Sequence, residues 1–151
     1  MTRPFFSLLF SISFGVYKNN DNNGGYQLTM TKRFEINGEE HELKITLNSV
    51  KYLNGLHEGG AFMLIQKAIS GDIDTYIAIV YAGLFHTGKG FTYKDVEAAV
   101  EQGIADEQID LDEINRTSYG VVAESFFYKA TVKKMFAKDP KAMEEIEALM
   151  K

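Results

Sequence analysis

The chain has 151 residues, of which 45% are hydrophobic and 13% aromatic, and 21 acidic against 16 basic residues give it a formal net charge of −5. This length fits a single domain with its own apolar core, and the acidic balance argues against general nucleic-acid binding, which requires a concentrated basic surface. There is no cysteine, so disulfide bonds and thiolate metal sites are excluded.

Residues 1–29 differ from the rest of the sequence. An apolar run at residues 5–16 precedes the polar run KNNDNNGG at residues 18–25. The apolar run has about the length of a signal-peptide core, but no A-x-A-like cleavage site follows it, and it is shorter than the ~20 residues that a transmembrane helix needs. We favour a natural start at Met30 over a true leader, because glycine codons just upstream can spell a ribosome-binding sequence. We therefore expect residues 1–29 to be a non-native extension or a disordered leader, and residues 30–151 to form the domain.

A β-hairpin is predicted at the start of this domain. Alternating apolar residues flank the pair Asn37-Gly38 on both sides: Phe34, Ile36, Leu43, Ile45 and Leu47. An Asn-Gly pair between alternating apolar residues is typical of a two-residue hairpin turn. Two strands alone are marginally stable in water, so the hairpin is expected to pack on helices or on the sheet of another chain.

Helices are predicted next. Asn48 or Ser49 is expected to cap a short helix that stops at Gly59-Gly60, and a second helix is expected to run to a C-terminal cap at Gly71. Asp72 can begin the following helix, which is apolar enough to be largely buried.

Three further helical segments complete the chain. Thr92 and Asp95 resemble a capping pair for the next helix. Residues 109–138 are expected to form a long helix interrupted only at Gly120, and Asp139-Pro140 is expected to end it and begin the last one. The sequence thus predicts a single small α+β, mainly α domain, with an N-terminal β-hairpin followed by five to six helices.

The stretch YAGLFHTGKGFTY, residues 81–93, raises the question of nucleotide binding, because three of its residues have the spacing of a phosphate-binding loop: Gly83, Gly88 and Lys89. That loop needs a buried parallel strand before it and a helix that begins at the Gly-Lys pair. Position 90 is glycine instead of serine or threonine, and the next helix is predicted from Thr92. We therefore interpret the stretch as a helix C-terminus closed by Thr87-Gly88, with His86 and Lys89 near its negative end, and expect no nucleotide site.

Other catalytic and metal-binding patterns are missing from the sequence. The three histidines, His41, His57 and His86, form no H-x-x-x-H pair. The acidic run at residues 105–115 lacks the glycine and the spacing of a calcium loop, and no serine lies in G-x-S-x-G. We predict no enzyme, no metal site and no cofactor.

The segment from Thr117 to Phe136 is apolar on nearly all sides. Such a helix either lies at the centre of a core or presents one face to a partner. The second alternative gives four candidate partner-binding residues: Tyr119, Phe126, Phe127 and Phe136. The edges of the hairpin are a further candidate contact with a neighbouring subunit.

The order of these segments resembles a known family. FEINGEEHELKITLNSVKYLN, then SGDIDTYIAIVYAGLFHTGKGFTYKDVEAAVEQG, then an acidic spacer and a long last helix are similar to the small tail assembly chaperones of long-tailed phages and prophages of Gram-positive bacteria. The resemblance covers roughly residues 31–138. Residues 1–29 depart from the family, which does not need such a leader.

The resemblance implies a non-enzymatic protein that binds the tape-measure protein, keeps it soluble and helps tail-tube subunits assemble around it. It also implies self-association into a homo-oligomer and action in the host cytoplasm, without a membrane or nucleic acid as partner. The alternative is a small protein-binding regulatory or antitoxin-like module, whose helices and acidic surface would suit a basic protein partner.

Overall fold

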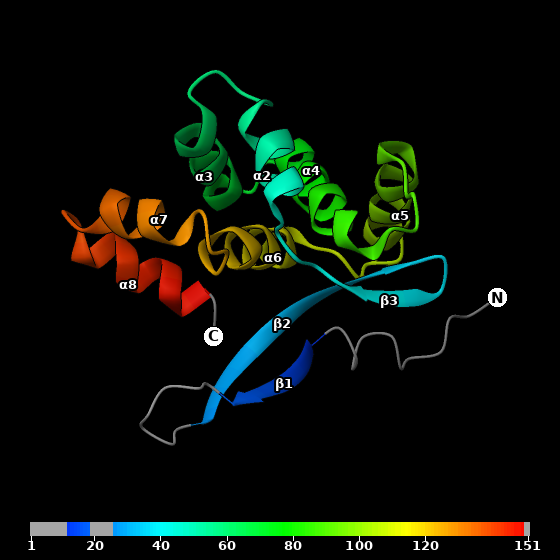
Figure 1. Ribbon diagram of the computed structural model, residues 1–151, viewed down its shortest axis with the longest axis horizontal. Helices are drawn as coiled ribbons and strands as arrows, with labels where there is room; N and C mark the ends of the chain where they lie inside the picture. The colour runs from blue at the N-terminus through cyan, green and yellow to red at the C-terminus, as the bar shows by residue number, and fades with distance from the viewer. Residues whose placement is uncertain (1–11, 19–25, 150–151) are drawn as a thin grey trace.

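The computed structural model describes residues 12–18 and 26–149. Figure 1 shows the helices gathered on one side of a long, narrow sheet. The predicted α+β, mainly α class is confirmed, with seven α-helices among the described residues where five to six were expected.

The sheet contains β1 (Ile12–Lys18), β2 (Tyr26–Ile36) and β3 (Glu39–Glu42) in the order β1-β2-β3, and both strand pairs are antiparallel. The predicted hairpin is β2–β3. Its turn residues have the positive φ angles that a type I′ turn requires, 55° at Asn37 and 80° at Gly38. β1 pairs with the first part of β2, from Tyr26 to Lys32. Much of this pairing falls within residues 1–29, whose separation from the domain stays a prediction.

The helices follow the hairpin in chain order: α2 (Leu47–Asn54), α3 (Gly60–Ser70), α4 (Ile73–Gly83), the short 3₁₀ helix η1 (Phe85–Thr87), α5 (Tyr93–Ala105), α6 (Leu111–Ala123), α7 (Lys129–Phe136) and α8 (Pro140–Leu149). α4 lies against α2, α5 and α6, and nearly all of its residues are buried. The burial of this helix confirms the prediction from its apolar sequence.

Most of the predicted caps are confirmed. Gly71 has a left-handed conformation at the end of α3, and the side chain of Asp72 accepts a hydrogen bond from Thr75 N. Thr92 and Asp95 form a complete capping box. The prediction of Asn48 or Ser49 as the first cap is wrong, because Thr46 occupies that position.

Ser49 is the third residue of α2, where it forms hydrogen bonds with the cap residue and with α4. Its hydroxyl accepts a hydrogen bond from Thr46 N and donates one to the carbonyl oxygen of Ala82, at 3.0 and 2.7 Å. A buried hydroxyl needs such partners, and the bond to Ala82 joins the start of α2 to the end of α4. The capping box of Thr46 and Ser49 therefore begins α2, and the same serine joins this helix to α4.

The predicted break at Gly120 is also wrong. Gly120 is buried inside α6, and the helix ends three residues later. Ser125 terminates it: its hydroxyl donates to the carbonyl oxygen of Val122 at 2.7 Å and accepts from Tyr128 N at 3.2 Å, which competes with continued helical bonding. The ring of Tyr128 is fully buried, and its hydroxyl donates to Asn54 Oδ1 at 2.8 Å, so the break is anchored to the end of α2.

Candidate partner-binding surface

The glycine at the start of the phosphate-loop-like stretch has a packing role. Gly83 is the last residue of α4, and a Cβ atom there would lie 3.2 Å from the Leu43 side chain. The Gly83 carbonyl oxygen also accepts a hydrogen bond from Lys44 N at 2.9 Å. Glycine at this position lets the backbone of α4 approach the segment that follows β3.

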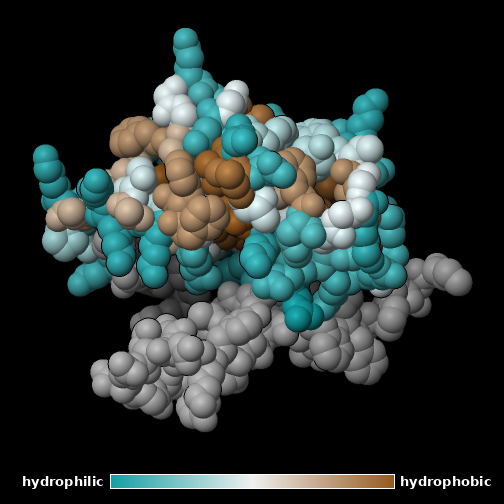
Figure 2. Space-filling model, in the orientation of Figure 1, coloured by the Kyte–Doolittle hydropathy of each residue, from teal (hydrophilic) through white to brown (hydrophobic). Residues whose placement is uncertain are grey.

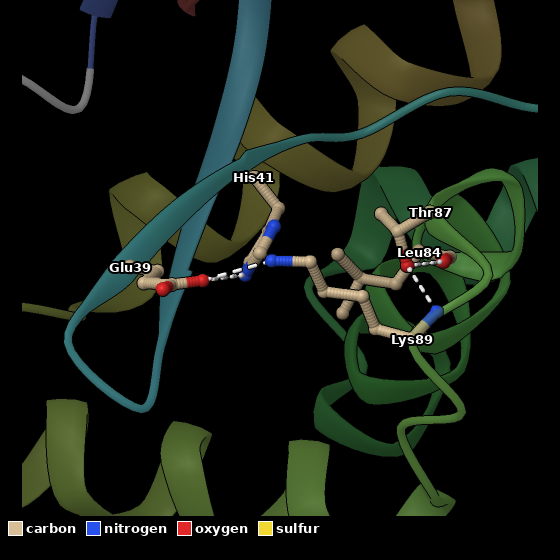
Figure 3. Close-up of polar contacts among 5 residues, drawn as sticks. All are labelled: Glu39, His41, Leu84, Thr87 and Lys89. Atoms are coloured by element: carbon tan, nitrogen blue, oxygen red, sulfur yellow. Dashed lines mark hydrogen bonds and ion pairs between the residues drawn. The ribbon is translucent and has the colours of Figure 1, made fainter.

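The second glycine closes η1. Gly88 has φ 66°, a left-handed conformation, and its N–H bonds the carbonyl oxygen of Phe85. The hydroxyl of Thr87 donates to the carbonyl oxygen of Leu84 at 2.7 Å (Figure 3). The predicted closure at Thr87-Gly88 is found at the end of η1, whereas α4 itself ends earlier, at Gly83.

The lysine of the stretch points to the hairpin. Figure 3 shows the side chain of Lys89 directed toward Glu39, with Nζ 2.9 Å from Glu39 Oε2. The ring of His86 bonds the carbonyl oxygen of Glu42 through Nε2, at 2.6 Å. Both residues lie at the end of η1, and their side chains in addition hold the hairpin. We call this set of contacts, made by Lys89, His86, Glu39 and Glu42, the hairpin latch.

The latch also determines the environment of His41. Its Nε2 atom lies 3.8 Å from Glu39 Oε2, and its ring packs edge-on against Phe91 with centroids 5.2 Å apart. Burial and the nearby ammonium group of Lys89 lower the pKa of His41, and the bond with Lys89 lowers the pKa of Glu39. These shifts arise from structural contacts between the hairpin and the helices.

No cluster of three metal-ligating side chains occurs in the described ranges 12–18 and 26–149. Across the same ranges, no single helix is long and apolar enough to span a membrane. α3 and the segment Ile73–Thr87 reach that length and composition only together, and they meet at a bend of 114°.

The structure divides the four candidate partner-binding residues into two groups. Tyr119 is 8% exposed and belongs to the core, and Phe136 is partly buried against it. Phe126 and Phe127 are 68% and 43% exposed, and their ring centroids lie 6.5 Å apart in the break between α6 and α7. Accessible aromatic surface therefore lies at Phe126 and Phe127.

Sequence reasoning missed other exposed apolar side chains, among them Phe62 on α3, Ile104 at the end of α5 and Leu111 at the start of α6. Ile73, in the first turn of the otherwise largely buried helix α4, is also exposed. Figure 2 shows apolar residues gathered over α3 and α6 with hydrophilic residues around them. For Ile104 and Leu111, the change from apolar to charged residues at the end of α5 was the sequence signal that could have indicated their exposure.

Other parts of the chain contact the edges of the β2–β3 hairpin, which the sequence suggested as a contact site for a neighbouring subunit. β1 covers one edge of β2 as far as Lys32. The outer side of β3 meets the hairpin latch, since His86 bonds the carbonyl oxygen of Glu42. β1 and the hairpin latch therefore contact part of the hairpin edge, and the use of the remaining edge by a neighbouring subunit stays a prediction.

A comparison with models of protein families identifies a match. The family model described as phage tail assembly chaperone protein, TAC, matches residues 33–137. No curated protein and no solved structure matches. The matched segment begins in β2 and ends just after α7, so it includes the hairpin latch and the exposed pair Phe126 and Phe127.

Proposed function

Because this chain belongs to the phage tail assembly chaperone family, we propose that it binds the tape-measure protein of its phage or prophage, keeps that protein soluble and helps tail-tube subunits assemble around it. It acts as a homo-oligomer in the host cytoplasm, where tails are assembled. It binds other proteins and catalyses no reaction.

The observation that carries the proposal is the exposed aromatic pair. Phe126 and Phe127 lie side by side in a short segment. Tyr128, the next residue, holds this segment in place through its buried ring and its hydrogen bond to Asn54. Burial of a phenylalanine ring at an interface contributes about 1.5–3 kcal/mol, and a rigid support reduces the entropy lost on binding. A long helical tape-measure chain exposes apolar stripes before the tail tube surrounds it, and this pair supplies a matching apolar contact.

Co-expression with the tape-measure protein of the same phage or prophage tests the proposal. The wild-type chain should co-purify with that protein and increase its soluble fraction. Phe126→Asp and Phe127→Asp should reduce both effects, since a charge in an apolar interface is left without a partner. Leu47→Asp is the matched control, because Leu47 is comparably exposed on α2, away from the pair in sequence.

The possible outcomes of this experiment test the proposed function and the proposed binding surface separately. A wild-type chain that neither co-purifies with the tape-measure protein nor raises its soluble fraction contradicts the function. If the wild type binds and the two aspartate variants bind equally well while remaining folded by circular dichroism, the function stands and the surface is wrong.

A further inference from the structure

The outer side of α7 continues the exposed aromatic pair. Lys129 N bonds the carbonyl oxygen of Ser125 at 3.1 Å, so helical winding begins at Ser125, before the first residue of α7. Tyr128 and Val132, four positions apart, are buried on the inner side of this winding. At about 3.6 residues per turn, the outer side carries a set of exposed residues: Phe126, Phe127, Ala130, Lys133 and Lys134. We call these residues the basic aromatic face.

The lysines of this face lie in a run of sequence without acidic residues. Residues 125–138 contain neither aspartate nor glutamate but four exposed lysines: Lys129, Lys133, Lys134 and Lys138. The acidic residues on either side of the run have partners of their own. Glu124 interacts with Lys32 and Lys129. Asp139 Oδ1 accepts a hydrogen bond from Ala142 N at 3.1 Å. In a chain of net charge −5, the basic aromatic face is therefore a positive region directly beside exposed rings.

A helix is the kind of partner that fits this face. A strand would need the free N–H and C=O groups of a sheet edge, whereas the central backbone groups of α7 bond within their own helix. Ala130 lies between the phenylalanines and the lysines, and its small side chain allows a second helix to pack along α7. Phe126 and Lys134 are eight positions apart, which corresponds to about 12 Å along a helix and about two turns of a partner.

α8 is an acidic helix that lies beside α7. Its sequence PKAMEEIEAL includes three glutamates and one lysine, together with apolar residues three positions apart: Met143, Ile146 and Leu149. α8 contacts both α6 and α7, and Figure 1 shows it running alongside α7. The chain itself therefore places a helix of acidic and apolar residues next to the lysine-rich α7, while the basic aromatic face is exposed.

We propose that the basic aromatic face selects client segments that form an amphipathic helix with acidic residues beside an apolar stripe. The client is the tape-measure protein, so the inference rests on the proposed function and adds the chemical class of the segment that is bound. The apolar stripe covers Phe126, Phe127 and Ala130. The acidic side chains reach Lys133 and Lys134, one to two helical turns further along.

The aromatic rings and the lysines have different effects on binding. Burial of the rings supplies most of the binding free energy and accepts any apolar helix. The lysines determine which apolar helix is accepted, because opposite charges attract across the interface and like charges repel. The client's acidic apolar stripes are therefore bound and its basic ones rejected, and the preference weakens as salt screens the exposed charges.

Three synthetic peptides of about 20 residues, a length at which an isolated helix can form, test this selection. They share one leucine stripe and carry glutamate, glutamine or lysine at the positions beside it. In fluorescence anisotropy titrations with the full chain, the glutamate peptide should bind about tenfold more tightly than the glutamine peptide, and the lysine peptide should bind most weakly. The differences between the peptides should shrink in high salt.

Charge reversal on α7 should invert this order. With Lys133→Glu and Lys134→Glu combined, the lysine peptide should bind best and the glutamate peptide worst, a result that an unfolded variant would not give. Lys51→Glu with Lys94→Glu is the matched control and should keep the order of the wild type, because these two exposed lysines lie on α2 and α5. Phe126→Ser should weaken the binding of all three peptides and keep their order, since the ring carries no charge.

Three results would overturn the proposal: equal affinities for the three peptides, no binding of any peptide, or an order that the charge reversal leaves unchanged. Binding of anionic phospholipid vesicles or of duplex DNA, without a preference for the glutamate peptide, would assign the face to another class of partner and overturn it as well.

The peptide titrations and the co-expression experiment can fail separately. A chain that does not co-purify with the tape-measure protein but prefers the glutamate peptide contradicts the proposed function alone. A chain that co-purifies with the tape-measure protein but does not discriminate among the peptides contradicts this inference alone.

Discussion

Lys89 Nζ lies 2.9 Å from Glu39 Oε2, and this ion pair joins two residues that are 50 positions apart in the sequence. Together with the bond between His86 and the carbonyl oxygen of Glu42, it fixes the β2–β3 hairpin against the segment that follows α4. A stretch whose spacing suggests phosphate binding thus serves to hold a hairpin on a helical domain.

The first prediction concerns this ion pair. Lys89→Ala should lower the melting temperature only slightly, because both side chains are at least half exposed and an exposed ion pair is screened by water and salt. Titration calorimetry with ATP or GTP should show no binding heat for either protein. Glu39→Gln is the matched control and should have the same small effect. Nucleotide binding by the wild type that disappears in Lys89→Ala would contradict the structural role assigned to this lysine.

The second prediction concerns the contact between Gly83 and Leu43. Gly83→Val should reduce the free energy of unfolding by roughly 1–3 kcal/mol, since a Cβ atom there already comes within 3.2 Å of Leu43 and the branched side chain adds volume. Urea denaturation measures this loss. The loss should be smaller in a Leu43→Ala background, where the space is available. Equal losses in both backgrounds would show that Gly83 matters for another reason.

The third prediction concerns pH. The pKa of His41 is below its ordinary value of 6.5, mainly because of burial and also because Lys89 and His86 lie near it, while Glu39 acts in the opposite direction. The unfolded chain therefore binds a proton first as the pH falls. The free energy of unfolding should be unaffected by this group above the ordinary pKa and should fall as the pH drops from there through the pKa of the folded state.

Urea denaturation at about pH 7.5 and about pH 5.5 checks this expectation, with His41→Gln as the control. Glu40 and Glu124 have pKa values raised by burial and act in the opposite direction, so the comparison with His41→Gln isolates the histidine. A wild type and a His41→Gln variant that lose the same stability between the two pH values would exclude His41 as the source.

The fourth prediction concerns residues 1–29. Deleting them should leave the melting temperature unchanged or raise it, because the core residues that the structure describes begin at Phe34 and the extensive contacts of β1 are with β2. Thermal melts of the full and shortened chains measure the difference. A large loss in the shortened chain would show that β1 is an integral strand of the domain.

The sequence by itself determined the local elements. The turn at Asn37-Gly38, the cap at Gly71 and the capping box of Thr92 and Asp95 occur where the pattern places them. Each depends on bonds or backbone angles within a few neighbouring residues, so residue type and spacing are sufficient. The order of these elements also carries the family resemblance, which the match over residues 33–137 confirms.

Only the tertiary structure decided which residues of the apolar segment Thr117–Phe136 are accessible. Tyr119 and Phe126 belong to the same residue class, yet one lies in the core and the other is exposed, because Ser125 ends α6 and the bond from Tyr128 to Asn54 holds the break in place. The pairing of Lys89 with Glu39 has the same origin. Such outcomes depend on contacts between residues far apart in the chain, and helical or strand periodicity contains no information about which distant surfaces meet.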